Sequence, residues 1–247
     1  MTVTELAKNL QSAQNITVLT GAGVSAESGV PTFRGPEGLW KTHRPEELAT
    51  PDAFIRDPKL VWEWYDWRRR LIAECQPNAA HTTLAAWSRT YPKFSLITQN
   101  VDGLHERAGT RTTIRFHGSI WELCCWNDCL SSPERWTDER VPLSPIPPQC
   151  PSCGQLARPG VIWFGESIDK DVLKRSLAST DCDVFLSIGT SGLVYPAASL
   201  TKEAKLRGAL TIEINPEDTP HTEIVDARFR SSAVQILNAI EDIKRTS

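Results

Sequence analysis

Residues 16–26, with the sequence ITVLTGAGVSA, run from a β-branched apolar segment directly into Gly-Ala-Gly. This order predicts a buried strand over residues 16–20, followed by a tight glycine turn and the opening of a helix. The glycines fit the pattern G-x-G-x-x-A, in which the backbone can approach a pyrophosphate closely at a helix N-terminus. An ordinary glycine turn fits the same pattern, so this stretch indicates a fold class before it indicates a ligand.

Helical and β-branched segments alternate along the rest of the chain. We expect further strands over 94–98, 113–116, 183–188 and 210–214, and helices over 4–14, 58–75, 78–90, 169–179, 197–207 and from 232 onward. Such alternation is typical of a mostly parallel sheet covered by helices on both faces. The sequence therefore predicts an α/β fold with a Rossmann-like parallel sheet.

The composition narrows the class of protein. The chain has 247 residues, and 27 Lys+Arg against 30 Asp+Glu give a formal net charge of −3. A dedicated nucleic-acid binder normally carries a basic surplus, so this balance argues against one. No apolar run approaches the ~20 residues that cross a bilayer, and the first residues lack the apolar segment of a signal peptide. We therefore expect a cytoplasmic protein with no membrane or nucleic-acid partner.

Seven cysteines are present, and five of them fall between positions 124 and 153. An odd number in a chain without a secretion signal argues against a disulfide framework. The spacing Cys125-x3-Cys129-x20-Cys150-x2-Cys153 suits tetrahedral Zn²⁺ held by four thiolates, and a closed coordination sphere makes the site structural. Cys124 is an alternative first ligand, and free buried thiols are the simpler alternative to any metal.

Two stretches interrupt the regular alternation and suggest a second domain. Residues 29–57 are rich in glycine, proline and charge and predict a long loop, and residues 118–160 show little helical or strand period. We expect 1–43, 76–117 and 160–247 to form the Rossmann-like domain. A helical insert (44–75) and a zinc-binding module (118–159) form the small domain, with the active site in the cleft between the two.

Clusters of polar residues or glycine follow the predicted strands. In an open parallel sheet, ligands bind outside the carboxyl ends of the strands, near the point where the strand order reverses. A shared position at these ends is a stronger indication of a ligand site than any single motif. The clusters are at 21–25, 99–102, 117, 189–191 and 215.

An ordinary dehydrogenase is not the expected outcome. Its dinucleotide fingerprint continues with a second strand that ends in Asp or Glu about 20 residues further on. Here that place is taken by residues 29–40, GVPTFRGPEGLW, which cannot form a central strand. A dinucleotide can still bind, but the usual arrangement for hydride transfer is absent.

Besides the paired cysteines, the chain contains several longer motifs: GAGVSAESGVPTFRG (21–35), TQNVDGLHERAG (98–109), FHGS (116–119), VIWFGE (161–166) and GTSGLVYPAA (189–198). In order and spacing they resemble the sirtuin family, and the resemblance covers residues 15–237. It implies NAD-dependent removal of acyl groups from protein lysines, in which nicotinamide leaves and the acyl group passes to ADP-ribose. The loop 29–40 would then cover the nicotinamide ribose, which explains the missing second strand.

The resemblance implies a role for individual residues. His117 resembles the general base that acts on a ribose hydroxyl, a task suited by a pKa near neutrality, and Asn100 and Asp102 complete the catalytic set. His81 and His105 are interpreted as residues near the core. The residues expected to bind the NAD co-substrate are Gly21, Ala22, Gly23, Ser25, Phe33, Arg34, Trp40, Gln99, Asn100, Asp102, Gly189, Thr190, Ser191, Asn215 and Ala233.

Tyr65 and Arg68 lie three residues apart, on one face of the helix predicted from residue 58. A phenol beside a guanidinium can clamp a carboxylate, and arginine can bind it in bidentate fashion. A solvated face over 68–70 is the plainer explanation. The Y-x-x-R pattern nevertheless resembles the class III sirtuins, which remove succinyl and malonyl groups, and Thr32 stands where most sirtuins have Asp. The resemblance thus implies desuccinylation and demalonylation, with deacetylation weaker or comparable.

Two other functions remain as alternatives. One is a non-catalytic NAD-binding or zinc-ribbon interaction protein, against which the intact His117, Asn100 and Asp102 argue. The other is mono-ADP-ribosyl transfer, in which another nucleophile intercepts the activated ribose. The favoured interpretation is a monomeric enzyme that uses NAD, holds one structural zinc per chain and acts on acyl-lysine proteins.

Overall fold

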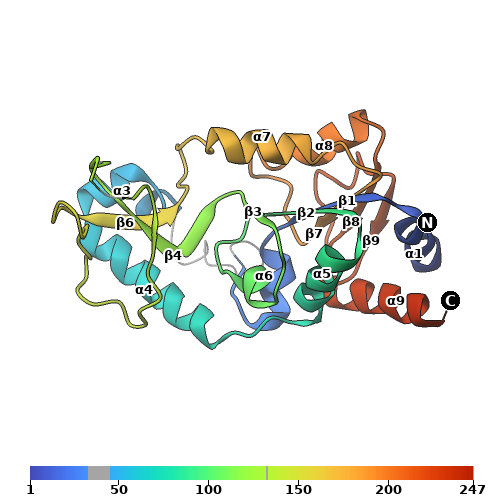
Figure 1. The fold of residues 1–247 in the computed structure, drawn as a ribbon, viewed down its shortest axis with the longest axis horizontal. Coiled ribbons are helices and arrows are strands. Elements are labelled where there is room, and N and C mark those ends of the chain that lie inside the picture. Colours follow the sequence, from blue (N-terminus) through green and yellow to red (C-terminus); the bar gives the residue numbers. More distant parts are fainter. Residues whose placement is uncertain (33–44, 132, 247) are drawn as a thin grey trace.

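A six-stranded parallel sheet organises one end of the molecule in the computed structural model, which describes residues 1–32, 45–131 and 133–246 (Figure 1). Its order is β3-β2-β1-β7-β8-β9, and every neighbouring pair is parallel. The chain therefore reverses its direction of travel across the sheet between β1 and β7. The strands are β1 (Asn15–Thr20), β2 (Lys93–Thr98), β3 (Thr113–Arg115), β7 (Val184–Ile188), β8 (Leu210–Ile214) and β9 (Ala227–Phe229).

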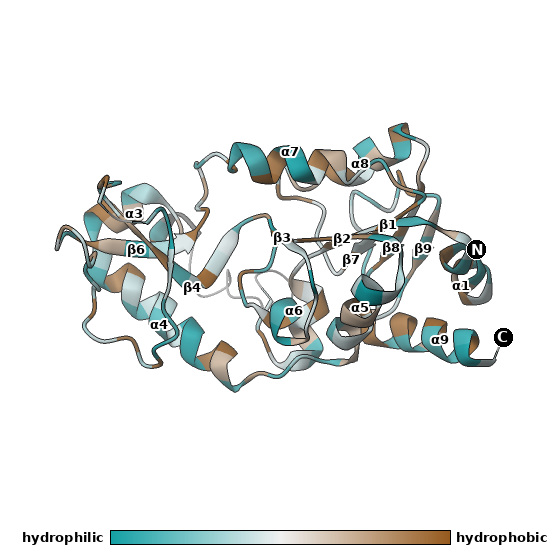
Figure 2. Ribbon diagram, viewed as in Figure 1, coloured by the Kyte–Doolittle hydropathy of each residue, from teal (hydrophilic) through white to brown (hydrophobic). Residues whose placement is uncertain are grey.

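Helices cover both faces of this sheet. On one face α1 (Val3–Ser12), α5 (Ala79–Thr90) and α9 (Ala233–Thr246) pack together over an apolar core. On the other face lie α7 (Lys170–Ala178) and α8 (Ser199–Leu206). Figure 2 shows the amphipathic pattern on α9, where hydrophobic and hydrophilic residues alternate along the helix. Burial of one face in this way is what fixes each helix on the sheet.

A smaller antiparallel sheet lies at the opposite end of the molecule (Figure 1). It consists of β4 (Gly118–Cys125), β5 (Trp136–Thr137) and β6 (Ala157–Val161), in the order β5-β4-β6. The helices α2 (Pro45–Leu48), α3 (Pro51–Arg56) and α4 (Pro58–Glu74) share an apolar core with it. The short helices η1 (Ala22–Ser28) and α6 (Leu104–Arg107) complete the described elements.

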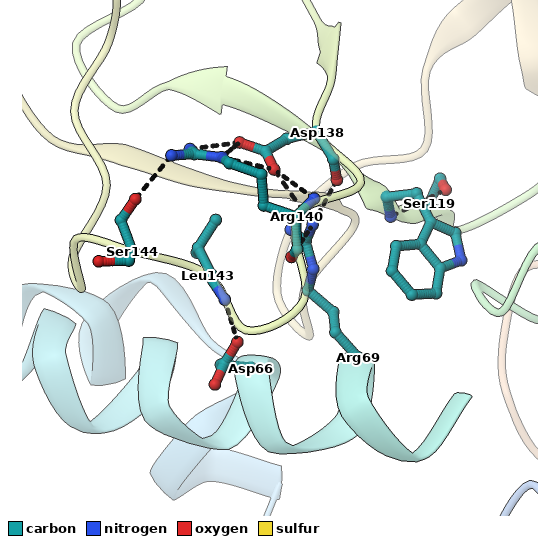
Figure 3. Close-up of polar contacts among 8 residues, drawn as sticks. Asp66, Arg69, Ser119, Asp138, Arg140, Leu143 and Ser144 are labelled. Carbon is teal, nitrogen blue, oxygen red and sulfur yellow. Dashed lines mark hydrogen bonds and ion pairs between the residues drawn. The ribbon is translucent and has the colours of Figure 1, made fainter. Parts of the chain in front are cut away.

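Polar contacts attach α4 to the segment that follows β5 (Figure 3). Asp66 Oδ1 accepts a hydrogen bond from the Leu143 amide at 2.6 Å. The fully buried Arg69 donates to the Arg140 carbonyl at 3.1 Å and forms an ion pair of 3.3 Å with Asp138. Asp138 is half-buried and also pairs with Arg140 Nη2 at 2.6 Å, so one carboxylate joins the two arginines.

The predicted α/β fold is confirmed, and helix ends follow the expected chemistry. The α4 helix begins at Pro58, with Asp57 Oδ1 accepting from the Leu60 amide at 2.9 Å. Asn78 caps α5 through the amides of Ala80 and His81. Among the described residues, none of the helices has the length and apolarity that crossing a membrane requires.

Three expectations about local structure were wrong. Residues 118–160 were expected to have little regular structure, yet they contain β4, β5 and most of β6. The strands were missed because β4 and β6 pair across a long loop and β4 is irregular between Gly118 and Leu123. The loop predicted over 29–57 contains α2 and α3, and the helix expected after Gly23 is the 3₁₀ segment η1. The domain boundaries proposed from the sequence stay a prediction.

Candidate active site

A cavity of about 680 Å³ opens at the carboxyl edge of the large sheet and extends to α4 and the segment after β6. Its wall is built where the strands β1, β2, β7 and β8 end, as expected for a ligand site at a switch point. Thirteen of the predicted site residues lie on this wall: Gly21, Ala22, Gly23, Tyr65, Arg68, Gln99, Asn100, His117, Gly189, Thr190, Ser191, Asn215 and Ala233.

Other predicted residues lie elsewhere. Ser25 and Asp102 are not on the cavity wall but are buried behind it, where they bond to one another. Phe33, Arg34 and Trp40 lie outside the described residues. The structure thus brings together residues from distant parts of the chain. Most of the predicted residues that it describes line the cavity, whereas Ser25 and Asp102 lie behind the wall and hold it in place.

Glycines allow the ends of β1 and β7 to meet. The Gly23 amide donates to the Gly189 carbonyl at 2.8 Å, and a Cβ on Gly23 would lie 2.8 Å from the Gly189 Cα. Gly189 also has a φ of +60°, a conformation that L side chains rarely adopt. A side chain at either position would push the two loops apart, so the glycine motif is required by packing as well as by any ligand.

Behind the wall, one serine hydroxyl joins several side chains. Ser25 Oγ donates to Asp102 Oδ2 at 2.8 Å and accepts from Asn100 Nδ2 at 3.1 Å. His81 Nε2 lies 3.2 Å from the same oxygen, while its Nδ1 accepts from the Asn78 amide at 3.3 Å. Nδ1 also lies 3.1 Å from Asn78 Oδ1, so Asn78 holds the imidazole on the side away from Ser25. This network fixes the amide of Asn100, which does reach the cavity.

Burial controls the charges of this region. It lowers the pKa of His81 to about 3, with the neighbouring His105 adding to the shift, and lowers the pKa of His105 to about 3. Burial also raises the pKa of Asp102, while hydrogen bonds from Leu104 and Ser25 oppose that rise. Both imidazoles are therefore neutral at physiological pH.

His117 presents a base to the cavity. Its Nδ1 lies 3.1 Å from the Gln99 carbonyl, and a carbonyl can only accept, so Nδ1 carries the proton of the neutral ring. Nε2 then holds the lone pair. Burial lowers the pKa of His117, and the bond to Gln99 partly opposes this. A neutral imidazole with a fixed tautomer has the properties of a general base.

Thr190 connects the loops that follow three strands. Its hydroxyl accepts from Gln99 Nε2 at 2.8 Å, and its carbonyl accepts from Asn215 Nδ2 at 2.8 Å. These bonds join the carboxyl ends of β2, β7 and β8, on both sides of the switch point between β1 and β7. The predicted cofactor residues on these loops are thus coupled to one another.

At the other end of the cavity, α4 contributes a phenol and a guanidinium. Tyr65 and Arg68 are both buried, and the Arg68 guanidinium lies 4.8 Å from the centre of the Trp64 ring. Burial lowers the pKa of Arg68, while the nearby Tyr65 and Asp102 oppose this. The hydroxyl of Tyr65 accepts from Trp163 Nε1 at 2.9 Å. A desolvated cation in such a place favours an anionic ligand group.

The sulfur atoms of Cys125, Cys129, Cys150 and Cys153 lie within 4.8 Å of one another. The Cys125–Cys153 and Cys129–Cys150 sulfurs are 3.6 and 3.7 Å apart. Four sulfurs bound at ~2.3 Å to one tetrahedral zinc are about 3.8 Å apart, so the cluster fits a structural Zn²⁺. Cys124 is not part of this cluster, and the geometry therefore favours Cys125 as the first ligand.

Comparison with known proteins identifies the family of this chain. The Sir2 family model matches residues 21–196. A protein from Aquifex aeolicus (strain VF5) named NAD-dependent protein deacylase is 54% identical over 232 residues, covering 94% of this chain and 95% of that protein. A solved complex of a mutant Sir2 homologue with ADP-ribose has a TM-score of 0.92 and 46% identity, covering 98% of this chain and 96% of that one. A Sir2–p53 peptide–NAD⁺ complex has a TM-score of 0.87 and 27% identity over 100% of both chains.

The chain belongs to the Sir2 family. This confirms the family predicted from the sequence and, with it, the enzyme class of NAD-dependent protein deacylases. The predicted NAD and structural zinc are likewise consistent with the ADP-ribose in a neighbouring structure and with the four-cysteine cluster.

Two contacts that support the site could not be predicted from the sequence. His81 was correctly expected near the core, but its bond to Ser25 was not foreseen, and neither was the bond from Trp163 to Tyr65. For His81 a signal existed: Asn78 and His81 have the spacing of a reciprocal helix cap, which places the imidazole at the start of α5. No comparable local signal links Trp163 to Tyr65.

Proposed function

We propose that this protein removes succinyl and malonyl groups, and acetyl groups less or comparably well, from protein lysines, releasing nicotinamide and O-acyl-ADP-ribose. One observation carries this proposal. Tyr65 and Arg68 lie on the wall of the same cavity as His117, and both are buried. An acyl group that ends in a carboxylate would there meet a desolvated guanidinium and a phenol, whereas an acetyl group offers neither of them an anionic partner.

The roles proposed for the other residues follow from their positions. His117 would accept a proton from a ribose hydroxyl at its Nε2, and Asn100 and Asp102, linked through Ser25, would hold the nicotinamide end in place. The glycines at the ends of β1 and β7, with Thr190, Ser191, Asn215 and Ala233, would bind the phosphates and adenosine. Bound NAD supplies a ribose activated by loss of nicotinamide, to which the acyl group is transferred.

The charges around Tyr65 and Arg68, at the end of the cavity proposed for the acyl group, support binding of a carboxylate there. Arg68 is held against the Trp64 and Tyr65 rings, with the guanidinium 4.8 and 5.7 Å from their centres. Burial raises the pKa of Tyr65, although Arg68 and the hydrogen bond from Trp163 oppose this, so the phenol keeps its proton and can donate. A charge-assisted pair with Arg68 is stronger than a neutral hydrogen bond, which gives acidic acyl groups the advantage.

The test is a panel of one peptide carrying acetyl, malonyl, succinyl or glutaryl lysine, with nicotinamide release and O-acyl-ADP-ribose as readouts. We expect succinyl and malonyl peptides to be processed at least as fast as acetyl. Arg68→Met should reduce desuccinylation about ten- to a hundred-fold more than deacetylation, because the lost interaction is worth ~1.5–3 kcal/mol. Arg70→Met is the matched control, since Arg70 on the same helix is exposed and pairs with Asp66.

Three outcomes would contradict the proposal. Equal losses on both substrates in Arg68→Met would reject the acyl preference, and turnover of acetyl peptide alone would do the same. Nicotinamide release that requires no acyl peptide would instead favour ADP-ribosyl transfer. We also propose a monomeric, cytoplasmic enzyme, and size-exclusion chromatography with light scattering tests the first of these properties.

A further inference from the structure

The hydroxyl of Tyr65 has an assigned direction. Trp163 Nε1 donates to Tyr65 Oη at 2.9 Å, and an indole N–H is a donor only, so the phenol oxygen must accept. Within the described ranges, Trp163 is the hydrogen-bond partner found for this hydroxyl. The phenol's own hydrogen is therefore available to an acceptor in the cavity, whose wall includes both side chains.

The indole itself is fixed by other groups. The guanidinium of Arg158 lies 3.7 Å from the centre of the Trp163 ring, and Phe54 packs nearby with its ring centre 5.4 Å away. The Trp163 amide donates to Glu166 Oε2 at 2.7 Å, and Arg158 Nη2 donates to the same oxygen at 2.9 Å. These contacts hold Trp163 independently of Tyr65. The indole N–H therefore has a fixed position, and it can fix the position of the phenol oxygen.

We propose that Trp163 is a positioning residue for acyl specificity, whose indole N–H holds the Tyr65 oxygen so that the phenol donates to the carboxylate of an acidic acyl group beside Arg68. This inference rests on the proposed desuccinylase function and deepens it. A donor that is already hydrogen-bonded at its oxygen is polarised and becomes a better donor. An acetyl group has no carboxylate to receive that bond, so the effect is specific to acidic acyl groups.

A merely structural Trp163 makes a different prediction. If the indole only fills space, its loss affects all acyl substrates alike, because it acts through the general shape of the cavity. If it orients Tyr65, its loss affects acidic acyl groups selectively, and only while the Tyr65 hydroxyl is present. Selectivity and dependence on Tyr65 therefore separate the two roles.

The experiment compares Trp163→Phe, Tyr65→Phe and the double variant on succinyl and acetyl peptides. Trp163→Phe keeps an aromatic ring under Arg158 and removes the N–H. We expect the ratio of desuccinylation to deacetylation, measured as kcat/KM, to fall about three- to ten-fold, mainly through KM for the succinyl peptide. The double variant should have the same ratio as Tyr65→Phe alone, because Trp163 acts through the Tyr65 hydroxyl and the effects of coupled residues do not add.

Trp87→Phe is the matched control. Trp87, on α5, is also buried and donates through Nε1, but to Glu241 Oε1 at 2.8 Å. This variant removes one buried indole N–H in the core beside the large sheet, away from Tyr65, so the substrate ratio should stay at the wild-type value. Replacing Trp163 by 3-benzothienylalanine, which has sulfur in place of N–H and the same ring size, repeats the test if Trp163→Phe folds poorly.

The outcomes are distinct. An unchanged ratio in the variants at position 163, an equal loss on both peptides, or additive effects in the double variant would each overturn the role of Trp163. Failure of the proposed function is seen instead in the unmodified enzyme, as an absence of desuccinylation or as insensitivity to Arg68→Met. A selective loss that disappears in the Tyr65→Phe background supports the inference.

Discussion

Ser25 Oγ donates to Asp102 Oδ2 at 2.8 Å, and this bond ties the glycine turn after β1 to the loop after β2. The same hydroxyl also accepts from Asn100, and His81 bonds to it from α5. One small side chain thus bonds to three polar side chains from two other segments of the chain, all of them buried. Its removal takes one hydrogen bond from each of these three side chains, although Asp102 keeps its bond from Leu104 and His81 keeps its contacts to Asn78.

Ser25→Ala is therefore expected to harm both stability and turnover. Leaving a buried polar group unsatisfied costs ~1–3 kcal/mol, so the free energy of unfolding should fall by about that amount. Turnover should fall about ten-fold or more, because the side-chain amide of Asn100 loses the hydrogen bond that fixes its position at the cavity. Urea denaturation and nicotinamide release measure the two effects. Ser179→Ala is the control, since that hydroxyl only donates to the Arg175 carbonyl at an exposed site; equal effects of both variants would contradict the expectation.

His117→Tyr should abolish turnover without lowering the melting temperature by more than a few degrees. In the unmodified enzyme, the base must be neutral, and burial holds the pKa of His117 below its ordinary value of 6.5. The neutral form predominates above the pKa, so kcat/KM should rise with pH, pass half its maximum below pH 6.5 and then level off. Substantial turnover by His117→Tyr, or an acidic limb above pH 7, would remove His117 as the base.

Buried neutral histidines also make stability depend on pH. The pKa of His81 is about 3 in the folded protein and about 6.5 when unfolded, so the unfolded chain binds the extra proton between these values. Stability is fully present above pH 6.5 and is lost as the pH falls toward 3, by about 1.4 kcal/mol per unit for such a group. Urea unfolding at pH 7.5, 6.5 and 5.5 should show this slope, and His81→Asn should reduce it. An identical slope in both proteins would refute the assignment.

The cysteine cluster predicts a sharp contrast between neighbouring residues. Cys125→Ser should lose zinc, because Cys125 belongs to the four-sulfur cluster, whereas Cys124→Ser should keep about one zinc per chain. Metal analysis of both purified variants gives the answer. Since structural zinc contributes to folding, chelation should also lower the melting temperature. Zinc retained by Cys125→Ser and lost by Cys124→Ser would reverse the ligand assignment.

Five of the six strands of the large sheet could be predicted because their information is local, whereas the short edge strand β9 was missed. The run over 16–20 followed by glycine defines β1, and the apolar face of Ile236, Leu237 and Ile240 defines α9, without reference to distant residues. The small sheet could not be predicted in this way. Gly118 pairs with Val161 across a long connection, the register shifts before Leu123, and the core beneath is shared with α3 and α4.

The same contrast between local and long-range information holds for the candidate site. The position of residues that follow strands, such as His117 and Asn215, could be predicted, because parallel strands bring their carboxyl ends to one edge of the sheet. The supporting contacts could not, because they join segments that no spacing rule connects. Ser25 meets His81 from 56 residues away, and Tyr65 meets Trp163 from 98 residues away. What orients a functional group is thus harder to predict than the group itself.

Arg68 and Arg69 are adjacent and both buried, yet they face different surroundings. Arg68 lies on the cavity wall, whereas Arg69 binds Asp138 and the Arg140 carbonyl away from it (Figure 3). Arg69→Met should therefore lower the free energy of unfolding by about 1–3 kcal/mol, because the Arg140 carbonyl loses a donor while Asp138 keeps its ion pair with Arg140. In the fraction that stays folded, the ratio of desuccinylation to deacetylation should not change. Arg68→Met should change that ratio with a smaller loss of stability. If Arg69→Met altered the ratio and Arg68→Met did not, the acyl end of the cavity would have to be reassigned to the other face of α4.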